Sequence, residues 1–381
     1  MKVLLITNDP TILDEGSSGH ARARDNAIRI GELHVLINGD TSASRDEGSL
    51  LVHTIPRARF RPYAPLEGAA IELIKKHGIQ AVWAQDPFEL GTVARKASAT
   101  AGIPFYVNVH TDFLSPWYSI HTGMFRSSKV PIPKEHRARI RLADTVLPNA
   151  AGIRTMSSRV KDSLVKKYGA SIKEPVVIPI QIHPPASQVS FPFSFPFTLI
   201  AVGRLDAGRR VIDIIDALAL IKDRYPGVGL FVVGDGPERK TLEKHAKKRK
   251  LEDRVIFLGD RRDTQGLMLS ANAFVQASAY EGFGRRLIQA ALARIPIITT
   301  DVGIVGEVFK GYDDVLAMPP GDPAALSIHI VGLMEDSQAR SLLVMHAEEA
   351  AKKFLAEAGN VPERLAAFLR GDRAPALQQL P

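Results

Sequence analysis

The chain has 381 residues, of which 45% are hydrophobic and 24% are charged, and it contains no cysteine. This composition is typical of a globular protein with two domains, each large enough for its own core. It excludes disordered, collagen-like and coiled-coil chains, disulfide scaffolds and sites built on cysteine. Lysine and arginine number 49 against 41 aspartates and glutamates, and the formal charge of +8 predicts an anionic partner.

The first ten residues, MKVLLITNDP, predict a strand. Only five apolar residues precede Asn8, and no small-residue cleavage site follows, so the pattern is not that of a signal peptide. No stretch of the sequence approaches the roughly 18 apolar residues of a membrane span. We therefore expect a cytoplasmic protein.

Short apolar runs alternate with helical patterns along the first half of the chain. This alternation indicates parallel βαβ units with helices on both faces of a sheet. In chain order the predicted elements are strand Val3–Thr7, helix Arg22–Ile30, strand Leu33–Ile37, helix Leu66–His77, strand Ala81–Ala84, helix Glu89–Ala101 and strand Pro104–Val109.

Prolines interrupt the alternation between residues 175 and 196, which predicts an extended linker. These are Pro175, Pro179, Pro184, Pro185, Pro192 and Pro196. The alternation then resumes with strand Thr198–Val202, helix Val211–Arg224, strand Val228–Val233, helix Glu238–Arg249, strands Val255–Leu258 and Ala273–Gln276, helix Arg285–Arg294 and strand Ile295–Thr299.

Two such series predict an α/β chain of two Rossmann-like domains facing a cleft. We place an N-terminal domain at 1–185, a Pro-rich linker at 186–197, a C-terminal domain at 198–371 and a frayed tail at 372–381. A ligand is then expected in the cleft, outside the carboxyl ends of the strands.

The segment Ser278–Gly284, with the sequence SAYEGFG, follows a predicted strand and opens a helix. Its glycines allow close approach of the backbone to a ligand, and free amides at a helix start favour an anion. Glu281 and Gln289 would lie roughly 12 Å apart along a helix, about the distance from a sugar across a diphosphate to a ribose. Spacing alone leaves open a second interpretation, a tight turn with a capping acid.

Three further clusters lie at strand ends. Gly203–Arg210, GRLDAGRR, could clamp a diphosphate with its guanidiniums, although a solvated turn is the commoner meaning of a lone cluster. Gly234–Glu238 is typical of a structural turn with proline at the helix start. Gly16–His20 lies where a glycine-rich loop would approach a ligand, but it matches no phosphate-binding pattern. His110 closes a predicted strand, where a buried histidine would ordinarily be the simpler interpretation.

Taken together, these motifs resemble the family 4 glycosyltransferases, a retaining group with the GT-B fold. The resemblance depends on the order and spacing of GRLDAGRR, GDGPE, EGFGRRLIQA and TDVGIVGEV, with QDPFELG and IPFYVNVHTDF in the first half. It covers nearly the whole chain and is strongest from Leu199 to Leu326. It implies transfer of a hexose from a nucleoside diphosphate sugar to a glycan or lipid-linked acceptor, in the synthesis of cell-envelope polysaccharide or glycolipid.

The resemblance also implies roles for individual residues. Four would act in catalysis: Glu281 contacts the transferred sugar, His110 lies near its reacting face, and Arg204 and Arg209 neutralise the donor diphosphate. The other implied contacts are main-chain amides at Gly282, Phe283 and Gly284, ribose hydrogen bonds from Gln289, a glycine loop containing Gly19, and a loop from Thr300 to Gly303 under the sugar or diphosphate.

Two of these positions differ from the family's pattern. Arg209 stands in place of a lysine, and Gln289 in place of a carboxylate; the amide can still accept a hydrogen bond but loses the charge assistance, worth about 1 kcal/mol or more. Arg210 and Arg286 add positive charge, which we also assign to the diphosphate site. A catalytically degenerate nucleotide-sugar-binding protein therefore stays open as an alternative. A sugar-nucleotide epimerase is a weaker one, because several carboxylates are then expected at the sugar.

The implied leaving group is an anionic nucleotide, which Arg204, Arg209 and helix-start amides can stabilise. No His/Asp cluster suggests a metal, so neither a metal nor another cofactor is expected. A double displacement needs a carboxylate under the sugar, and the implied role of Glu281 is binding. We therefore expect attack on the face from which the leaving group departs, with the donor phosphate taking the acceptor proton.

Two other basic segments could indicate contact with anionic lipid or with nucleic acid. Ile153, Met156, Val160 and Leu164 recur at helical spacing among basic residues, which predicts an amphipathic helix. It either contacts anionic lipid at the inner face of a membrane or packs on the sheet, and we favour packing. The seven basic residues of Arg239–Lys250 are interpreted as a solvated helix face. Nucleic acid is not expected, because the clusters lack interleaved aromatic residues.

Specificity is the least defined property. Base recognition is expected near Gly234–Gly236 and the turn Gly259–Arg261, where no residue decides between uracil and guanine. Acceptor specificity is expected in loops of the first domain, notably Pro116–Ile132.

Overall fold

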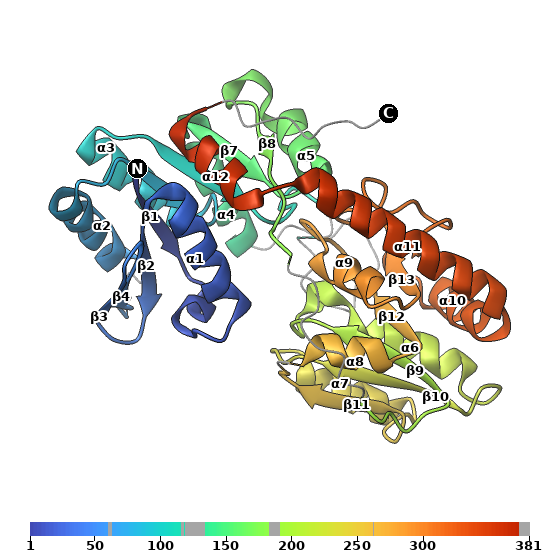
Figure 1. Ribbon diagram of the computed structural model, residues 1–381. Coiled ribbons are helices and arrows are strands. Elements are labelled where there is room, and N and C mark those ends of the chain that lie inside the picture. The colour runs from blue at the N-terminus through green and yellow to red at the C-terminus, as the bar shows by residue number, and fades with distance from the viewer. Residues whose placement is uncertain (60–62, 116–117, 119–133, 183–190, 262, 373–381) are drawn as a thin grey trace. The chain divides into compact units, whose positions relative to one another are not determined.

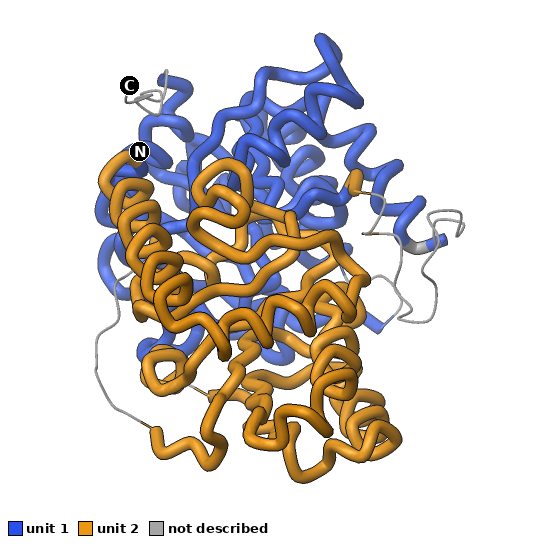
Figure 2. The backbone as a smooth tube through the Cα atoms, turned by 90° about the vertical axis from the view of Figure 1, so that its right-hand side faces the viewer, with its two compact units in different colours: residues 1–113, 133–181, 358–381 blue, residues 114–132, 182–357 orange. Residues whose placement is uncertain are grey.

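The computed structural model describes residues 1–59, 63–115, 118, 134–182, 191–261 and 263–372. The chain divides into two compact units, which Figure 2 draws in different colours, and Figure 1 labels their helices and strands. Unit 1 comprises Met1–Phe113, Pro133–Gln181 and Ala358–Pro381, and unit 2 comprises Leu114–Ile132 and Ile182–Glu357. The expected linker thus lies at the start of unit 2, and its residues 186–190 are outside the described ranges, as are residues 373–381 of the expected tail.

Unit 1 contains an eight-stranded sheet in the order β3-β4-β2-β1-β5-β6-β7-β8. The β3–β4 pair is antiparallel, and the other neighbouring strands are parallel. The strands are β1 Lys2–Thr7, β2 Glu32–Gly39, β3 Ala43–Glu47, β4 Leu50–Pro56, β5 Ala81–Ala84, β6 Phe105–Val109, β7 Gly152–Thr155 and β8 Val176–Val177. The central strands are buried along most of their length, as expected for parallel strands covered on both faces.

The helices of unit 1 begin and end at typical capping residues. Ser17 accepts a hydrogen bond from the backbone of His20 at the start of α1, and left-handed glycines, Gly78 and Gly102, end α2 and α3. The helices are α1 Ser18–Ile30, α2 Ala64–His77, α3 Glu89–Ala101, α4 Lys134–Val146, α5 Ser158–Tyr168 and α12 Val361–Arg370, with short 3-10 turns η1 Pro10–Leu13, η3 Leu147–Asn149 and η4 Gly169–Ser171.

Unit 2 contains a six-stranded parallel sheet in the order β11-β10-β9-β12-β13-β14. Its strands are β9 Phe197–Val202, β10 Val228–Val233, β11 Val255–Gly259, β12 Ala273–Gln276, β13 Ile297–Thr300 and β14 Leu316–Met318. Its helices are η5 Ala207–Arg209, α6 Val211–Ile221, α7 Arg239–Lys248, α8 Thr264–Ser270, α9 Arg285–Leu292, α10 Pro323–Glu335 and α11 Ser337–Ala358. Numbered from β9, this order is that of a Rossmann fold, and it reverses between β9 and β12.

The predicted α/β class with two Rossmann-like domains is confirmed. Several segments differ from the sequence prediction. β3 and β4 form a hairpin where no strand was predicted, and β8, at Val176–Val177, extends the sheet just after Pro175, where the prolines begin. The last helix, α12, belongs to unit 1 although the predicted C-terminal domain ran to 371. The ring of Phe368 in α12 packs edge-on against Tyr106 of β6, with centroids 5.1 Å apart, which explains its place.

The amphipathic helix predicted over 153–164 is wrong in its first half. Ile153 lies in β7, and α5 begins only at Ser158, because Ser157 caps the helix by accepting a hydrogen bond from Val160. Val160 and Leu164 are buried in unit 1, as the packing interpretation requires. No helix in the described part of the chain is both long and apolar enough to cross a membrane.

A buried chain of histidines joins β2, β4 and the end of α2. His34 Nδ1 lies 3.1 Å from His53 Nε2, and His34 Nε2 lies 2.8 Å from a Glu32 carboxylate oxygen. Ser44 Oγ lies 3.0 Å from His53 Nδ1, and the ring of His77 lies 4.4 Å from that of His34. Burial, aided by the neighbouring His34, His77 and Lys76, lowers the pKa of His53 to about 4.

We expect unit 1 to lose stability below neutral pH because of this cluster. In the unfolded chain His53 has its ordinary pKa of 6.5, whereas in the folded chain its pKa is about 4, so protonation of His53 favours unfolding. The stabilisation is therefore complete above pH 6.5 and is lost progressively toward pH 4, by roughly 3 kcal/mol. Urea unfolding of wild type and His53→Gln between pH 7.5 and 4.5 measures it. Equal acid sensitivity of the two proteins would contradict this expectation.

Candidate functional site

The motif residues of unit 2 meet where the strand order reverses. The loops after β9 and β12 leave neighbouring strands there, and such a point commonly forms a binding crevice. Arg209 in η5 forms an ion pair with Glu281 through its Nη1 and the Glu281 Oε1. Ser278 Oγ donates to the same carboxylate oxygen at 3.1 Å and accepts from Arg209 Nη1 at 3.4 Å. One hydroxyl thus joins the cation and the anion.

The local sequence brings the two loops together. Asp206 caps η5 by accepting a hydrogen bond from the backbone N–H of Arg209 at 3.2 Å. Ala279 N–H donates to the Gly208 carbonyl at 2.8 Å, and a Cβ on Gly208 would lie 2.9 Å from the ring of Tyr280. Glycine is therefore needed at 208 for the loops to touch.

Glu281 and the start of α9 rest on the loop that follows β13. The Phe283 carbonyl accepts from the Ile304 N–H at 2.9 Å, and a Cβ on Gly303 would lie 2.4 Å from that carbonyl. Gly284 has φ 99° and caps α9. The side chain of Glu281 is 11% exposed, and Phe283 is buried. A ligand could therefore contact the Glu281 carboxylate and main-chain amides here, but the Phe283 ring is part of the core.

A pocket of about 620 Å³ lies beside this cluster, at the carboxyl ends of β9, β10 and β11. It includes Gly234–Gly236 and Arg261, where base recognition was expected. Arg261 is held by two hydrogen bonds to the Asp263 carboxylate, at 2.8 and 2.6 Å. Arg204 also lines the pocket, and its side chain is 75% exposed. The residues lining the pocket are Val202, Gly203, Arg204, Val233, Gly234, Asp235, Gly236, Pro237, Asp260, Arg261, Thr264 and Arg286.

Gln289 lies one turn into α9 and is already engaged by a neighbour. Its Oε1 accepts a hydrogen bond from Arg286 Nη1 at 2.8 Å. Arg286 also lies 3.5 Å from Thr264 Oγ1, and burial lowers the pKa of Arg286 to about 10. Burial likewise lowers the pKa of Arg209.

Arg210 does not join this site, which corrects its assignment to the diphosphate. Its guanidinium makes two hydrogen bonds to the carboxylate of Asp213 in α6, at 2.6 and 2.8 Å. Both side chains are only 6% exposed. Arg210 has the left-handed φ of 49° at the turn into α6, so it closes a structural ion pair in the core of unit 2.

The two predicted residues of the first half belong to unit 1. Gly19 lies in the first turn of α1, and a Cβ there would lie 1.9 Å from Thr11 Oγ1, so the loop before α1 requires glycine. His110 follows β6 and lies 3.3 Å from Asn108 Nδ2. Burial, with the nearby cations Arg154 and Arg22, lowers the pKa of His110 to about 3, so the imidazole is neutral at physiological pH.

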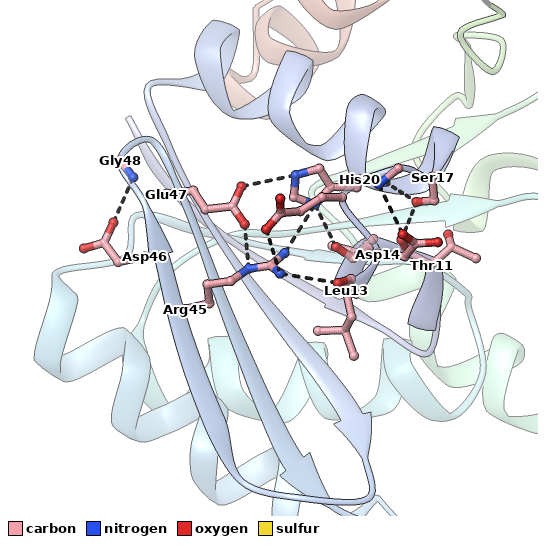
Figure 3. A network of polar contacts seen from close by, with 12 residues as sticks. Thr11, Leu13, Asp14, Ser17, His20, Arg45, Asp46, Glu47 and Gly48 are labelled. Atoms are coloured by element: carbon pink, nitrogen blue, oxygen red, sulfur yellow. Dashed lines mark hydrogen bonds and ion pairs between the residues drawn. The ribbon is translucent and has the colours of Figure 1, made fainter.

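A polar network that sequence reasoning missed fixes the loop before α1 (Figure 3). In β3, Glu47 Oε2 lies 3.2 Å from His20 Nε2, and Glu47 Oε1 lies 2.6 Å from Arg45 Nε. Arg45 also donates to the Leu13 carbonyl at 3.3 Å. Arg45 and Glu47 lie on β3, which is polar and largely exposed and gave no strand signal in the sequence, so the network was not foreseen.

Four buried amide oxygens cluster along adjacent strands of unit 1. They lie at the carboxyl ends of β2, β1, β5 and β6, which are neighbours in that order. Within the described residues they have no hydrogen-bond partner: Asn38 Oδ1, Asn8 Oδ1, Gln85 Oε1 and Asn108 Oδ1. This edge of the sheet therefore offers acceptors to a ligand that carries hydroxyl groups.

The described ranges hold no cluster of three or more histidine, aspartate or glutamate side chains able to bind a metal ion.

Comparison with known proteins assigns both halves of the chain. Residues 29–183 match the family described as Glycosyltransferase Family 4, and residues 187–353 match Glycosyl transferases group 1. A glycogen synthase of Mycobacterium tuberculosis is 29% identical over 191 residues, which are 49% of this chain and 46% of that protein. The lipopolysaccharide core biosynthesis glycosyltransferase LpsD of Rhizobium meliloti is 25% identical over 255 residues, 66% of this chain and 71% of that protein. The match to the glycogen synthase thus spans less than half of its length.

Solved structures share the fold over nearly the whole chain. Anabaena HepE in complex with UDP-glucose has a TM-score of 0.73 and 20% identity, covering 97% of this chain and 99% of that one. Sucrose-phosphate synthase from Thermosynechococcus elongatus has a TM-score of 0.77 and 18% identity, with 97% and 98% covered. The fold predicted from the motifs, GT-B, is confirmed.

The Arg210–Asp213 pair gives a prediction for stability. Arg210→Met leaves a buried carboxylate without its main cation, so we expect a loss of about 3–5 kcal/mol in the free energy of unfolding. The double variant Arg210→Met/Asp213→Leu should recover most of this loss, because no buried charge remains. Urea unfolding measures both, with Arg239→Met as a control on an exposed helix. A double variant as unstable as the single one would refute the pairing.

Proposed function

The chain belongs to the glycosyltransferases whose two halves are the Family 4 and group 1 domains, and we propose that it transfers a hexose from a nucleoside diphosphate sugar with retention of anomeric configuration. The observation that carries this proposal is the Arg209–Glu281–Ser278 cluster beside an arginine-lined pocket at the reversal point of the second sheet. The related LpsD, named for lipopolysaccharide core biosynthesis, supports an acceptor of the glycan or lipid-linked class in the cell envelope.

Positive charge from the chain itself suits a diphosphate leaving group. Arg204 is exposed at the pocket, and Arg209 keeps further N–H donors besides the one paired with Glu281. The helix α9 begins directly after Glu281–Gly284, and we propose that its first amides help to stabilise developing negative charge. We therefore propose a reaction that needs no bound metal. Unchanged turnover in excess EDTA supports this, and activity that requires added Mg²⁺ or Mn²⁺ refutes it.

The ion pair of Glu281 bears on the mechanism. A carboxylate that is paired with Arg209 and bonded to Ser278 is held for binding sugar hydroxyls, not poised as a nucleophile. We propose that the bond from the anomeric carbon to the phosphate oxygen breaks, and its electron pair leaves with the nucleotide. The acceptor oxygen then attacks from the same face, and its proton passes to the departing phosphate. His110 is neutral, so it can hydrogen-bond the sugar without adding charge.

We propose that the acceptor binds along unit 1. The unpartnered oxygens of Asn8, Gln85 and Asn108 can accept hydrogen bonds from the hydroxyls of a glycan. The loop Pro116–Ile132, where acceptor specificity was expected, includes residues outside the described ranges, so this expectation stays a prediction. Contact with an anionic membrane also stays a prediction.

A catalytically silent nucleotide-sugar-binding protein is the second candidate. The observation that favours it is that residue 289 is a glutamine where the resemblance implies a carboxylate, and that Arg286 already donates to its Oε1. Tight binding of UDP or GDP without hydrolysis or transfer of any sugar would establish this alternative.

Substitution of Glu281 tests the enzymatic proposal. Thermal shift with UDP-, GDP-, ADP- and CMP-sugars first identifies the donor, which should raise the melting temperature by about 2 °C or more. With that donor, Glu281→Gln should lower kcat about 100-fold or more, since the side chain loses its charge but keeps its size. The exposed Glu252→Gln serves as the control.

Azide separates the mechanisms in the same assay. We expect no rescue of Glu281→Gln by azide, because no covalent sugar–enzyme intermediate forms. Rescue that yields an inverted sugar azide would contradict front-face attack, and a fold that no donor stabilises would contradict the transferase proposal itself.

A further inference from the structure

A contact between two tyrosines lies directly beside the Arg209–Glu281 ion pair. The ring of Tyr280 packs edge-on against the ring of Tyr118, with centroids 4.9 Å apart and planes inclined by 61°. The same Tyr280 ring covers the η5 turn so closely that a Cβ on Gly208 would lie 2.9 Å from its Cε1 and from its hydroxyl oxygen. Tyr280 therefore contacts both Tyr118 and the turn that carries Arg209.

Tyr118 belongs to a segment that follows the last strand residues named for the acceptor side. The chain up to Phe113 is part of unit 1, whereas Leu114–Ile132 is part of unit 2. The N–H of Tyr118 donates to the Ser115 carbonyl at 3.0 Å, so a tight turn presents the tyrosine. The contact with Tyr280 thus attaches the start of this segment to the donor side of unit 2.

The Tyr280 ring is placed to affect both charges of the ion pair. Tyr280 precedes Glu281 in the chain, and its ring covers Gly208, which precedes Arg209. A rotation of the ring away from Gly208 would therefore let the two charged side chains move relative to each other. Burial raises the pKa of Tyr280 to about 12, so the phenol stays neutral and acts on the pair through packing.

We propose that Tyr118 is a positioning residue for the donor site, because its ring holds Tyr280 against Gly208 and thereby sets the separation of Arg209 and Glu281. Edge-to-face aromatic contacts are directional, so Tyr118 favours one orientation of the Tyr280 ring. The segment from which acceptor specificity was expected then also takes part in binding the donor. The inference rests on the proposed function, because it requires a donor that carries both a diphosphate and a sugar.

The test measures how well the two parts of a donor are bound together. A ligand that spans Arg209 and Glu281 gains most when the two groups are held at the right separation, whereas a nucleoside diphosphate without a sugar needs only the cations. The informative quantity is therefore the Kd of a nucleotide sugar divided by the Kd of its nucleoside diphosphate. Isothermal titration of the intact chain with UDP and UDP-glucose, and with GDP and GDP-mannose, supplies this ratio.

Substitutions of the two tyrosines give the expected pattern. Tyr118→Leu removes the aromatic ring and should raise the ratio about 5-fold, the change expected for the loss of one aromatic pair. Tyr280→Leu should raise it at least as much, and the double variant should match Tyr280→Leu, because Tyr118 acts through Tyr280. Tyr118→Phe keeps the ring and should retain the wild-type ratio.

Tyr312→Leu is the matched control in the same unit. The ring of Tyr312 is exposed and packs edge-on against His329 of α10, with centroids 5.9 Å apart. Its replacement should leave the ratio unchanged, and melting temperatures close to that of the wild type establish that the variants are folded.

Four results would overturn the inference and leave the proposed function intact. They are an unchanged ratio in Tyr118→Leu, a Tyr118→Phe variant as impaired as Tyr118→Leu, additive effects in the double variant, and a wild type that binds UDP or GDP but neither nucleotide sugar. If Tyr118→Leu did not fold, an unchanged ratio in Tyr280→Leu would overturn it equally. A wild type that binds none of the four ligands would overturn the proposed function, and the inference with it.

Discussion

The ion pair between Arg209 and Glu281 is the interaction on which the site of unit 2 depends. Each residue comes from a different loop, and the two loops leave adjacent strands at the point where strand order reverses. Ser278 contacts both partners, and the backbone bond from Ala279 to Gly208 fixes the loops independently of the charges. The carboxylate proposed for the sugar and the cation proposed for the diphosphate are thus set at a fixed separation before any ligand binds. Such pre-organisation is what electrostatic catalysis requires.

The same geometry separates structural charges from those available to a ligand. Arg210 is adjacent to Arg209 in sequence, but it is buried against Asp213 on α6. Arg204, Arg261 and Arg286 instead line the pocket. The formal charge of +8 is therefore only partly explained by an anionic ligand. Most of the basic residues of α7 lie on its exposed face, where solvation accounts for them.

Buried parallel strands were the most predictable part of the fold. β5, β10 and β12 have the predicted bounds, because short continuous apolar runs have few other places in a soluble protein. The β3–β4 hairpin was missed because β3 is polar and largely exposed, and so carries no pattern of burial. The helix predicted from Ile153 began too early, because a strand followed by a capped helix can imitate helical spacing.

The candidate site was likewise predictable only in part. The resemblance of the motifs to family 4 glycosyltransferases predicted that Arg209 and Glu281 serve one site, whereas the βαβ alternation alone did not show that their strands are neighbours. Motif order could not show that Arg210 takes a left-handed backbone and pairs inward, nor that Arg286 engages Gln289. Both depend on a local backbone turn or on the direction of a side chain, which the order of motifs does not show. The network of His20, Arg45 and Glu47 was likewise out of reach, because it depends on the missed hairpin.

We propose that this pre-organised site transfers a sugar with retention of configuration. Proton NMR of the sugar formed at early times from an α-linked nucleoside diphosphate donor tests it most directly, because the anomeric coupling constant reports the configuration before mutarotation. We expect an α-configured product together with release of the nucleoside diphosphate. A β-configured first product, or no nucleotide release from any donor that binds, would contradict it.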